Sequence, residues 1–145
     1  MNIAKICIGI FVVACLFTLL TGSSHTNIDG VNFNIPSGFE AGETQEYVKQ
    51  GHHITEVDYK NKDGIGSFSI KIVDNYQPKN KKSEKTGVRG NTVASTSTET
   101  IHGHTGIKTF LANTNGVFAE QFTYDVDDKH VIVTTSNVGV DDIIV

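Results

Sequence analysis

Six histidines are the residues of this 145-residue chain whose number and spacing most directly suggest chemistry. His102 and His104 are separated by one residue, so their rings would project to the same side of an extended segment. With a third imidazole they would offer three neutral nitrogen ligands to a divalent metal. The residues able to supply that third ligand are His52, His53 and His130. We therefore take His102 and His104 as candidate metal ligands. Gly103 and Gly106 also give this segment the composition of a turn, in which histidines are usually only exposed.

Other patterns that carry chemistry are incomplete in this chain. Gly64 and Gly66 resemble part of a phosphate-binding loop, but their surroundings predict a hairpin and no following helix. The sequence contains no Gly-x-Ser-x-Gly motif. A Ser/His/Asp set gathered from distant positions stays open, because such residues meet in space and not along the chain. The sequence therefore indicates no catalytic residue and no cofactor.

The N-terminus has the pattern of an export signal. Lys5 is followed by the uncharged, apolar run Ile6–Leu20 and then by small polar residues at 21–24. A basic start, an apolar stretch shorter than a comfortable membrane span and a small-residue exit are typical of a secretory signal peptide. We expect cleavage after Ser23 or Ser24.

Two alternatives for the N-terminus are open. Residues 6–20 would serve as an uncleaved anchor if they span a thinned bilayer, or Cys15 would end a lipobox and carry an acyl chain. In each case residues 1–24 are the signal peptide or anchor and residues 25–145 form a single extracytoplasmic domain. Contact with a membrane is then expected through the N-terminal segment only.

Cysteine usage and charge exclude several functions. Both cysteines, Cys7 and Cys15, lie in the N-terminal segment. The exported part therefore has no thiol for thioredoxin-like chemistry, a cysteine hydrolase or a zinc ribbon. The formal net charge of −4 disfavours nucleic acid as a partner.

Beyond residue 20 the chain has the composition of a β-protein. Leu111 is its only leucine, whereas Val, Ile and Thr, which fit a pleated sheet, are abundant. Alternating polarity and turn residues predict the strands Val31–Ile35, Ile54–Lys60, Ile65–Val73, Thr92–Ile101, Ile107–Ala112, Val117–Tyr124 and His130–Thr135. Thr92–Ile101 is rich in Ser and Thr and is predicted to be an edge strand, and the last three strands are predicted to form an antiparallel meander.

The segments between these strands are expected to be irregular or helical. His25–Asp29 reads as a linker, Glu43–Lys49 as a single helical turn and His102–Gly106 as a turn. Asn137–Val145 is expected to begin a short helix with Asn137 as its cap. Gln77–Asn91 carries five basic residues and favours a solvated loop, with a basic arm for an anionic surface as the alternative.

Turn lengths indicate which side chains face the core. A loop at 61–64 places on one face the residues Thr55, Val57, Tyr59, Phe68, Ile70 and Ile72. In the meander, a loop of four or two residues ending at Gly116 and a two-residue turn at Asp127 and Asp128 define two faces. The predicted core face is Ile107, Leu111, Phe118, Phe122, Tyr124, Val131 and Val133, and the opposite face is Lys108, Gln121, Thr123, His130 and Thr134. Glu120 falls on the core face, where three explanations are open: it lies at the rim, a bulge rotates it outward, or it is buried with a partner.

One resemblance covers most of residues 28–136. A strand ending in Ile35-Pro36-Ser37-Gly38-Phe39, then a hairpin, a polar insertion, a glycine-containing turn and a terminal meander resemble small secreted or membrane-anchored proteins of methanogenic archaea with no assigned function. The strand closed by Pro-x-Gly-aromatic ahead of an antiparallel sheet is more remotely similar to the PsbP and Mog1-like α+β fold. Neither resemblance implies catalytic residues.

The sequence thus predicts an α+β fold that is mainly antiparallel sheet with little helix, or alternatively an all-β fold. The expected function is that of a non-enzymatic extracytoplasmic domain, secreted or held at the cell surface, which binds a small ligand or surface partner or associates structurally. The alternative is a small secreted hydrolase or metal-dependent enzyme that uses its histidines. Convergence of two or more histidines with a carboxylate in a pocket would favour the enzyme.

Overall fold

The computed structural model describes residues 23–75, 92–112 and 118–145. The side chains of 92–94, 112 and 118 are outside this description. The predictions for residues 1–22, for the basic segment from Gln77 to Asn91 and for the turn from Asn113 to Gly116 therefore lie outside the described residues, as does the predicted inward position of the Phe118 side chain.

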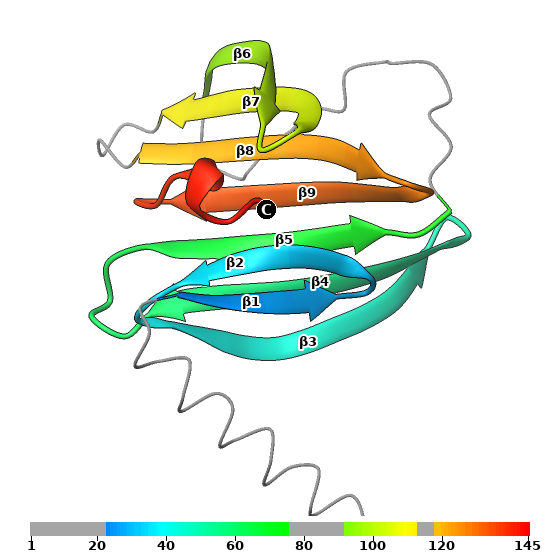
Figure 1. Ribbon diagram of the computed structural model, residues 1–145, viewed down its shortest axis with the longest axis horizontal. Helices are drawn as coiled ribbons and strands as arrows, with labels where there is room; N and C mark the ends of the chain where they lie inside the picture. The colour runs from blue at the N-terminus through cyan, green and yellow to red at the C-terminus, as the bar shows by residue number, and fades with distance from the viewer. Residues whose placement is uncertain (1–22, 76–91, 113–117) are drawn as a thin grey trace, which may run out of the picture.

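The described residues form two antiparallel sheets (Figure 1). The strands are β1 (Ser23–Ile28), β2 (Val31–Pro36), β3 (Phe39–Lys49), β4 (His52–Asn61), β5 (Ser67–Val73), β6 (Thr92–Ile101), β7 (His104–Ala112), β8 (Phe118–Val126) and β9 (Lys129–Ser136). β1 and β2 pair as a hairpin, and the other seven strands form a sheet in the order β3-β4-β5-β9-β8-β7-β6. A short 3₁₀ turn, η1 (Val140–Asp142), follows β9.

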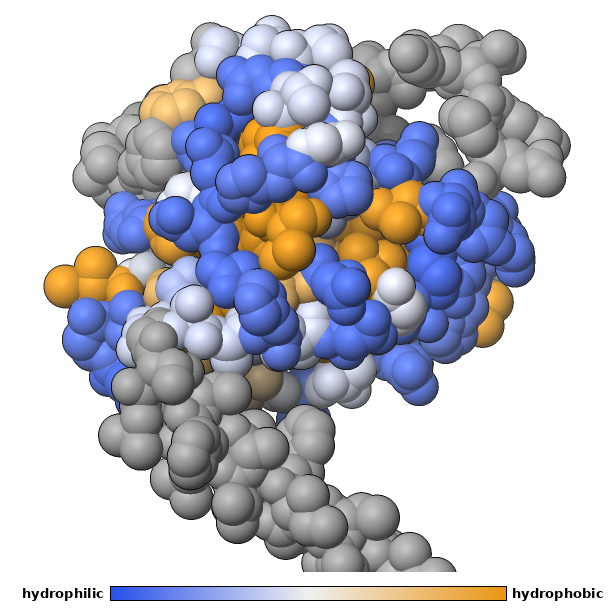
Figure 2. Space-filling view, viewed as in Figure 1, coloured by the Kyte–Doolittle hydropathy of each residue, from blue (hydrophilic) through white to orange (hydrophobic). Residues whose placement is uncertain are grey.

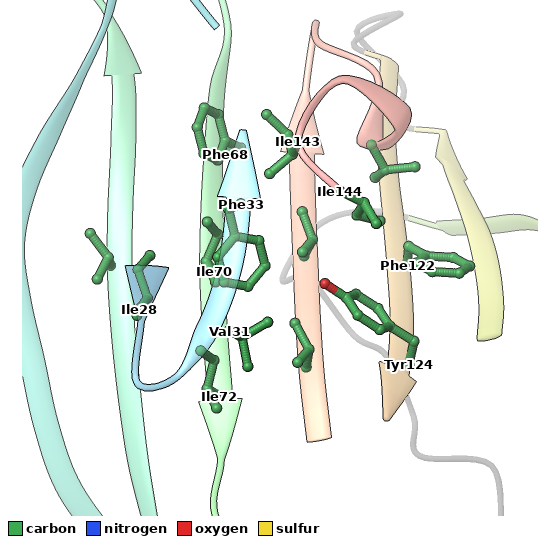
Figure 3. Close-up of a cluster of buried hydrophobic side chains, with 14 of the residues drawn as sticks. Ile28, Val31, Phe33, Phe68, Ile70, Ile72, Phe122, Tyr124, Ile143 and Ile144 are labelled. Atoms are coloured by element: carbon green, nitrogen blue, oxygen red, sulfur yellow. The ribbon is translucent and has the colours of Figure 1, made fainter. Parts of the chain in front are cut away.

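One hydrophobic core lies between the seven-stranded sheet and a second layer. The β1–β2 hairpin lies over β4 and β5, and the C-terminal segment with η1 lies over β8 and β9 (Figure 1). Phe33 of β2, Phe122 of β8 and Val140 of η1 are each 0% exposed. Figure 3 shows Phe33 and Val31 directed at Ile70 and Ile72 of β5, with Ile143 and Ile144 beside them. We call the covered face of the large sheet the inner face and its other side the outer face.

Most predicted strands are confirmed. β2 ends at Pro36, and Gly38 takes the positive φ of 90° that its turn requires. In the β4–β5 hairpin Lys60 pairs with Ser67 instead of Ile65, a shift of two residues that leaves every side chain on its predicted face. β7, β8 and β9 form the predicted meander, and β6 is an edge strand.

The fold is closer to the all-β alternative than to α+β, because the described residues contain no α-helix. The expected helical turn near Glu43 belongs to strand β3, and the expected linker from His25 belongs to β1. Both strands carry mostly polar side chains, so the alternation that marks a half-buried strand is weak in them. At the C-terminus η1 is capped by Gly139 and not by Asn137, whose φ of 57° is left-handed.

The predicted register between β7 and β8 is wrong. Ala112 pairs with Phe118, so five residues lie between the two partners. Each even-numbered residue of β7 therefore pairs with an even-numbered residue of β8. Phe122, Tyr124, Val131 and Val133 are buried in the inner core as predicted, whereas Leu111 and Ile107 lie on the outer face and Lys108 lies on the inner face beside Phe122. Because the number of residues between the partners Ala112 and Phe118 is odd and the predicted loop length was even, the side chains of β7 lie on the face opposite to the predicted one.

The predicted turn from His102 to Gly106 is shorter than expected. His102 and Gly103 form it with φ values of 47° and 86°, and β7 begins at His104. Gly106 lies within β7, where a Cβ atom would be 2.0 Å from the Thr123 carbonyl oxygen. This glycine therefore permits the close approach of two backbones instead of a turn.

Candidate functional site

The group of side chains closest to a functional constellation lies at one end of the large sheet. It consists of Asp29, His53, Asp74 and Lys129, and we call it the Lys129 cluster. His53 is the second residue of β4, Asp74 follows β5 and Lys129 begins β9, so three adjacent strands bring these residues into line. Asp29 comes from the tip of the β1–β2 hairpin, where its φ of 48° shapes the turn.

Lys129 joins the two carboxylates of this cluster. Its Nζ lies 2.9 Å from Asp74 Oδ1 and 3.1 Å from Asp29 Oδ2. The other oxygen of Asp74, Oδ2, is 3.2 Å from His53 Nδ1. The Asp74 backbone is held as well, because its N–H donates to the His53 carbonyl at 2.9 Å and its carbonyl lies 3.1 Å from His52 Nδ1.

Electrostatics in the Lys129 cluster favour the ion pair. Burial opposes ionisation of Asp74, but hydrogen bonds from Lys129 and His53 outweigh it and lower the pKa of that carboxyl. Burial likewise opposes the charge on Lys129, and the two aspartates outweigh it and raise the pKa of the ammonium. Both groups are therefore charged across the ordinary pH range.

The chemistry available to this cluster is metal binding or proton transfer through the histidine. Asp29, His53 and Asp74 each offer one ligand atom, and these atoms lie within 4.8 Å of one another. Asp74 also orients the His53 ring, which is 41% exposed and so reaches solvent. The ammonium of Lys129 contacts both carboxylates, however, so a cation would have to displace it. As it stands, the cluster ties the hairpin tip to three strands of the sheet.

The candidate metal ligands His102 and His104 lie elsewhere, at the turn before β7 and at its start. His102 Nδ1 is 2.7 Å from the Ile144 carbonyl oxygen, and His104 Nε2 is 2.8 Å from that of Val145. Both rings therefore contact the C-terminal segment, although His102 and Gly103 form a turn and not the extended segment that the same-side prediction assumed. Among the described residues, the group of three ligand-type side chains includes neither of them. Their role as metal ligands stays a prediction.

His130 lies on the outer face, as predicted, and is buried beside Asp125, with Nδ1 at 2.6 Å from Oδ1. The contact of His52 described above is with the backbone carbonyl oxygen of Asp74 and not with a carboxylate. Among the five histidines proposed to converge, His53 therefore contacts the carboxylate of Asp74, and His130 contacts the carboxylate of Asp125. The convergence in a pocket that would favour an enzyme is not found in the described part of the chain.

Glu120 is buried with partners, the third of the three explanations. It is 7% exposed, and its Oε2 accepts a hydrogen bond from the Val140 N–H at 3.1 Å. Its Oε1 lies 3.6 Å from Lys108 Nζ, which also approaches Glu99 and Asp141. Burial lowers the pKa of Lys108, but Glu120 and these two carboxylates outweigh burial and raise it. Glu120 therefore fastens η1 to the sheet.

A shallow groove of about 330 Å³ lies on the outer face. Its walls come from β4, β5, β8 and β9, and the residues that project into it by register are Asp58, Lys60, Ser67, Ser69, Ala119, Thr134 and Ser136. Four of these carry hydroxyl groups, and none of the described residues that line the groove is a histidine. The opposite side of the molecule is mainly hydrophilic, with hydrophobic residues visible in gaps near its centre (Figure 2).

Sequence reasoning missed the Lys129 cluster and the groove. Asp29 precedes Gly30 and Asp74 follows β5, so both aspartates look like ordinary turn residues. The groove residues would have been grouped by a correct pairing of β5 with β9, which are distant in the sequence.

Comparison with models of known protein families finds no match to this chain, and comparison with curated proteins finds none either. In the described part of the chain, no helix has the length and apolar character that crossing a membrane requires.

Proposed function

We propose that this chain is an exported domain that acts at the cell surface by binding a small ligand or a surface partner, without catalysing a reaction. The pattern of Lys5, the apolar run to Leu20 and the small residues after it supports export. The partner is not a nucleic acid, since the chain is acidic overall.

The observation that carries this proposal is that polar side chains fall into two groups: those that join segments of the fold and those that line the outer groove. The charged side chains and histidines that cluster hold one segment of the fold to another: the hairpin through Lys129, η1 through Glu120 and the last residues through His102 and His104. The outer groove is instead lined by hydroxyl groups beside Asp58 and Lys60. Such a surface offers hydrogen bonds to a ligand and no histidine for catalysis.

The alternative, a small secreted hydrolase or metal-dependent enzyme, has one observation in its favour. Asp74 orients His53 in the way that carboxylates orient catalytic or metal-bound histidines, and Asp29 lies close by. The ion pairs to Lys129 weigh against it, because the ammonium already occupies the position between the two carboxylates.

Co-sedimentation with cell envelopes tests the binding proposal and separates the groove from the Lys129 cluster as the binding surface. The protein released or extracted from producing cells would be mixed with envelopes from cells that lack the gene, and the bound fraction measured. Ser69→Gln narrows the groove and is expected to lower the bound fraction at least fivefold. Lys71→Gln, on the same strand and face but outside the groove lining, is the matched control and should bind like the parent.

His53→Asn tests the Lys129 cluster in the same experiment. Under the binding proposal this variant sediments like the parent protein. Full binding by Ser69→Gln would overturn the groove as the binding surface. Loss of binding in His53→Asn, with thermal unfolding unchanged, would overturn the proposal in favour of the Lys129 cluster.

A further inference from the structure

The two edges of the seven-stranded sheet differ in how they oppose pairing with another strand. β3 and β6 are the terminal strands of the sheet, and each pairs with one neighbour among the described residues. A terminal strand exposes a row of backbone N–H and C=O groups, and proteins commonly protect it with charges and bulges. This difference is the basis of the inference.

β3 is protected along its length. It carries Glu40, Glu43, Glu46 and Lys49, and a register irregularity between Ala41 and Thr44 interrupts it. An incoming copy of β3 would meet like charges along the strand, which are destabilising when directly opposed.

β6 has much less protection. Its sequence, TVASTSTETI, contains a single charged residue, Glu99. That carboxylate is already engaged within its own chain, with Ser97 Oγ at 3.1 Å and Lys108 Nζ at 3.5 Å. The side chains from Ser95 to Thr98 are exposed, and the irregularity between Val93 and Ser95 leaves Ser95–Ile101 as a regular run. Threonine is also among the residues most favourable in strands.

We propose that β6 pairs with β6 of a second copy of this chain, antiparallel and centred on Thr98, so that two large sheets become continuous. Centring on Thr98 pairs the whole run Ser95–Ile101 of one copy with the same run of the other, because Ser95 then lies opposite Ile101. Thr96 opposes Thr100, Thr98 opposes itself, and Ser97 opposes Glu99. Thr–Thr and hydroxyl–carboxylate pairs are compatible across strands, and no two like charges face each other.

The symmetry of this arrangement agrees with the layered fold. A two-fold axis perpendicular to the sheet pairs residues of the same face, so the inner faces of both copies lie on one side. The side chains from Ser95 to Thr98 are exposed, and β6 lies at the end of the large sheet away from the β1–β2 hairpin (Figure 1), so the hairpin does not cover the partner strand's position.

The interface is small and therefore weak in dilute solution. A strand pair of this length gains strength where copies are concentrated on one surface, since a high local concentration replaces intrinsic affinity. The inference thus rests on the proposed location at the cell surface and goes beyond the proposed function by adding a contact between copies of this chain. It does not depend on the outer groove.

Disulfide cross-linking in producing cells tests the pairing. The full chain, with Cys7→Ser and Cys15→Ser to remove its own thiols, would carry Thr98→Cys. Under mild oxidation this variant is expected to give covalent dimers, because the two thiols face each other across the strand pair. Gln45→Cys, exposed on the other edge strand, is the matched control and should stay monomeric.

Charge substitutions test the register. In the Thr98→Cys background, Thr96→Lys with Thr100→Lys places two lysine pairs in direct opposition and is expected to lower the dimer yield at least fivefold. Thr96→Lys with Thr100→Glu places opposite charges there and should keep the yield. Residues 96 and 100 are about 13 Å apart along one strand, so neither variant creates a close pair within a monomer.

Three outcomes would overturn the proposal: no dimer of Thr98→Cys in cells, equal dimer yields for Thr98→Cys and Gln45→Cys, or equal yields for the two charge variants. Mixed cross-links between Thr98→Cys and Gln45→Cys, with ladders of higher mass, would replace the symmetric pair with head-to-tail β6–β3 contacts. Circular dichroism verifies that each variant folds. If the envelope experiment fails while these cross-links form, the pairing stands and only the groove is rejected.

Discussion

The ammonium of Lys129 lies 2.9 Å from Asp74 Oδ1, and this contact makes stability depend on pH. The pKa of Asp74 is lowered in the folded protein, from an ordinary value of about 3.9. Its stabilising contribution is therefore present above about pH 4 and is lost as the pH falls through the folded pKa. The raised pKa of Lys129 gives the opposite sign, so its contribution is lost only above about pH 10.4.

Thermal unfolding between pH 2 and pH 7 measures this effect. The melting temperature of the parent protein should fall below pH 4, and Asp74→Asn should show a lower melting temperature at pH 7 with a smaller decrease in acid. Asp58→Asn, an exposed aspartate on β4, is the control and should keep the parental slope. An unchanged slope in Asp74→Asn would show that other carboxyl groups control acid unfolding.

Removal of the Lys129 ammonium should expose a metal site. Lys129→Gln leaves Asp29, His53 and Asp74 without their cation, and we expect it to bind Zn²⁺ in the micromolar range because two carboxylates and one imidazole suit that ion. Titration calorimetry with zinc makes the measurement. The double variant Lys129→Gln, His53→Ala should lose the binding, and equal heats in both would place the ion elsewhere.

The same titration examines His102 and His104. Zinc binding by the parent protein that disappears in the His102→Ala, His104→Ala variant would assign these residues as ligands. Unchanged binding would leave them as contacts to the carbonyl groups of Ile144 and Val145.

Export is expected from the N-terminal pattern. Residues 1–30 fused to a reporter should carry it out of the cytoplasm, because the basic start, apolar run and small-residue exit occur together. Mass spectrometry of the native N-terminus then separates cleavage near Ser23 from an intact anchor. Since β1 begins at Ser23, cleavage after Ser23 or Ser24 removes one or two residues from the start of β1, with their pairs to Pro36 and Ile35. A reporter that stays soluble inside the cell would contradict the prediction.

Much of the fold could be predicted from alternation in buried strands. β2, β4, β5 and β9 have one apolar face against the core, so period-two patterns mark them and even show which side chains point inward. β1 and β3 were missed because their side chains are mostly polar. Their strand conformation comes from pairing with β2 and β4, which a local pattern does not record.

The candidate site was less predictable because it depends on contacts between distant segments. Asp29, His53, Asp74 and Lys129 come from four separate parts of the chain, and each resembles a solvated turn or strand-end residue in the sequence. The predicted β7–β8 register is wrong for a related reason: one residue more or less in the loop moves every side chain of one strand to the opposite face. The position of Lys108 opposite Phe122 follows from that single difference.

Tyr124 offers a test of the core through its hydroxyl group. The side chain is 3% exposed, burial raises its pKa, and the hydroxyl oxygen has no hydrogen-bond partner among the described residues. Tyr124→Phe removes a buried polar atom that has no partner, so stability should be unchanged or higher by about 1 kcal/mol. Phe122→Ala, on the same strand and face, should cost about 3 to 5 kcal/mol. Urea unfolding compares them, and a loss above 1 kcal/mol in Tyr124→Phe would reveal a missing partner.

Glu120 tests whether a buried carboxylate holds the C-terminal segment in place. Glu120→Ala removes the acceptor of the Val140 N–H and a partner of Lys108, and we expect a loss of about 2 to 3 kcal/mol in unfolding free energy. Glu120→Gln keeps an oxygen for the N–H and should lose less, about 1 kcal/mol. Asp141→Asn is the control, because that side chain is 63% exposed and its contact with Lys108 is weak. Hydrogen exchange at the Val140 amide gives the local readout: it should quicken strongly in Glu120→Ala and little in Asp141→Asn. Equal exchange in all three variants would mean that apolar packing of Val140 and Ile143 alone holds η1 on the sheet.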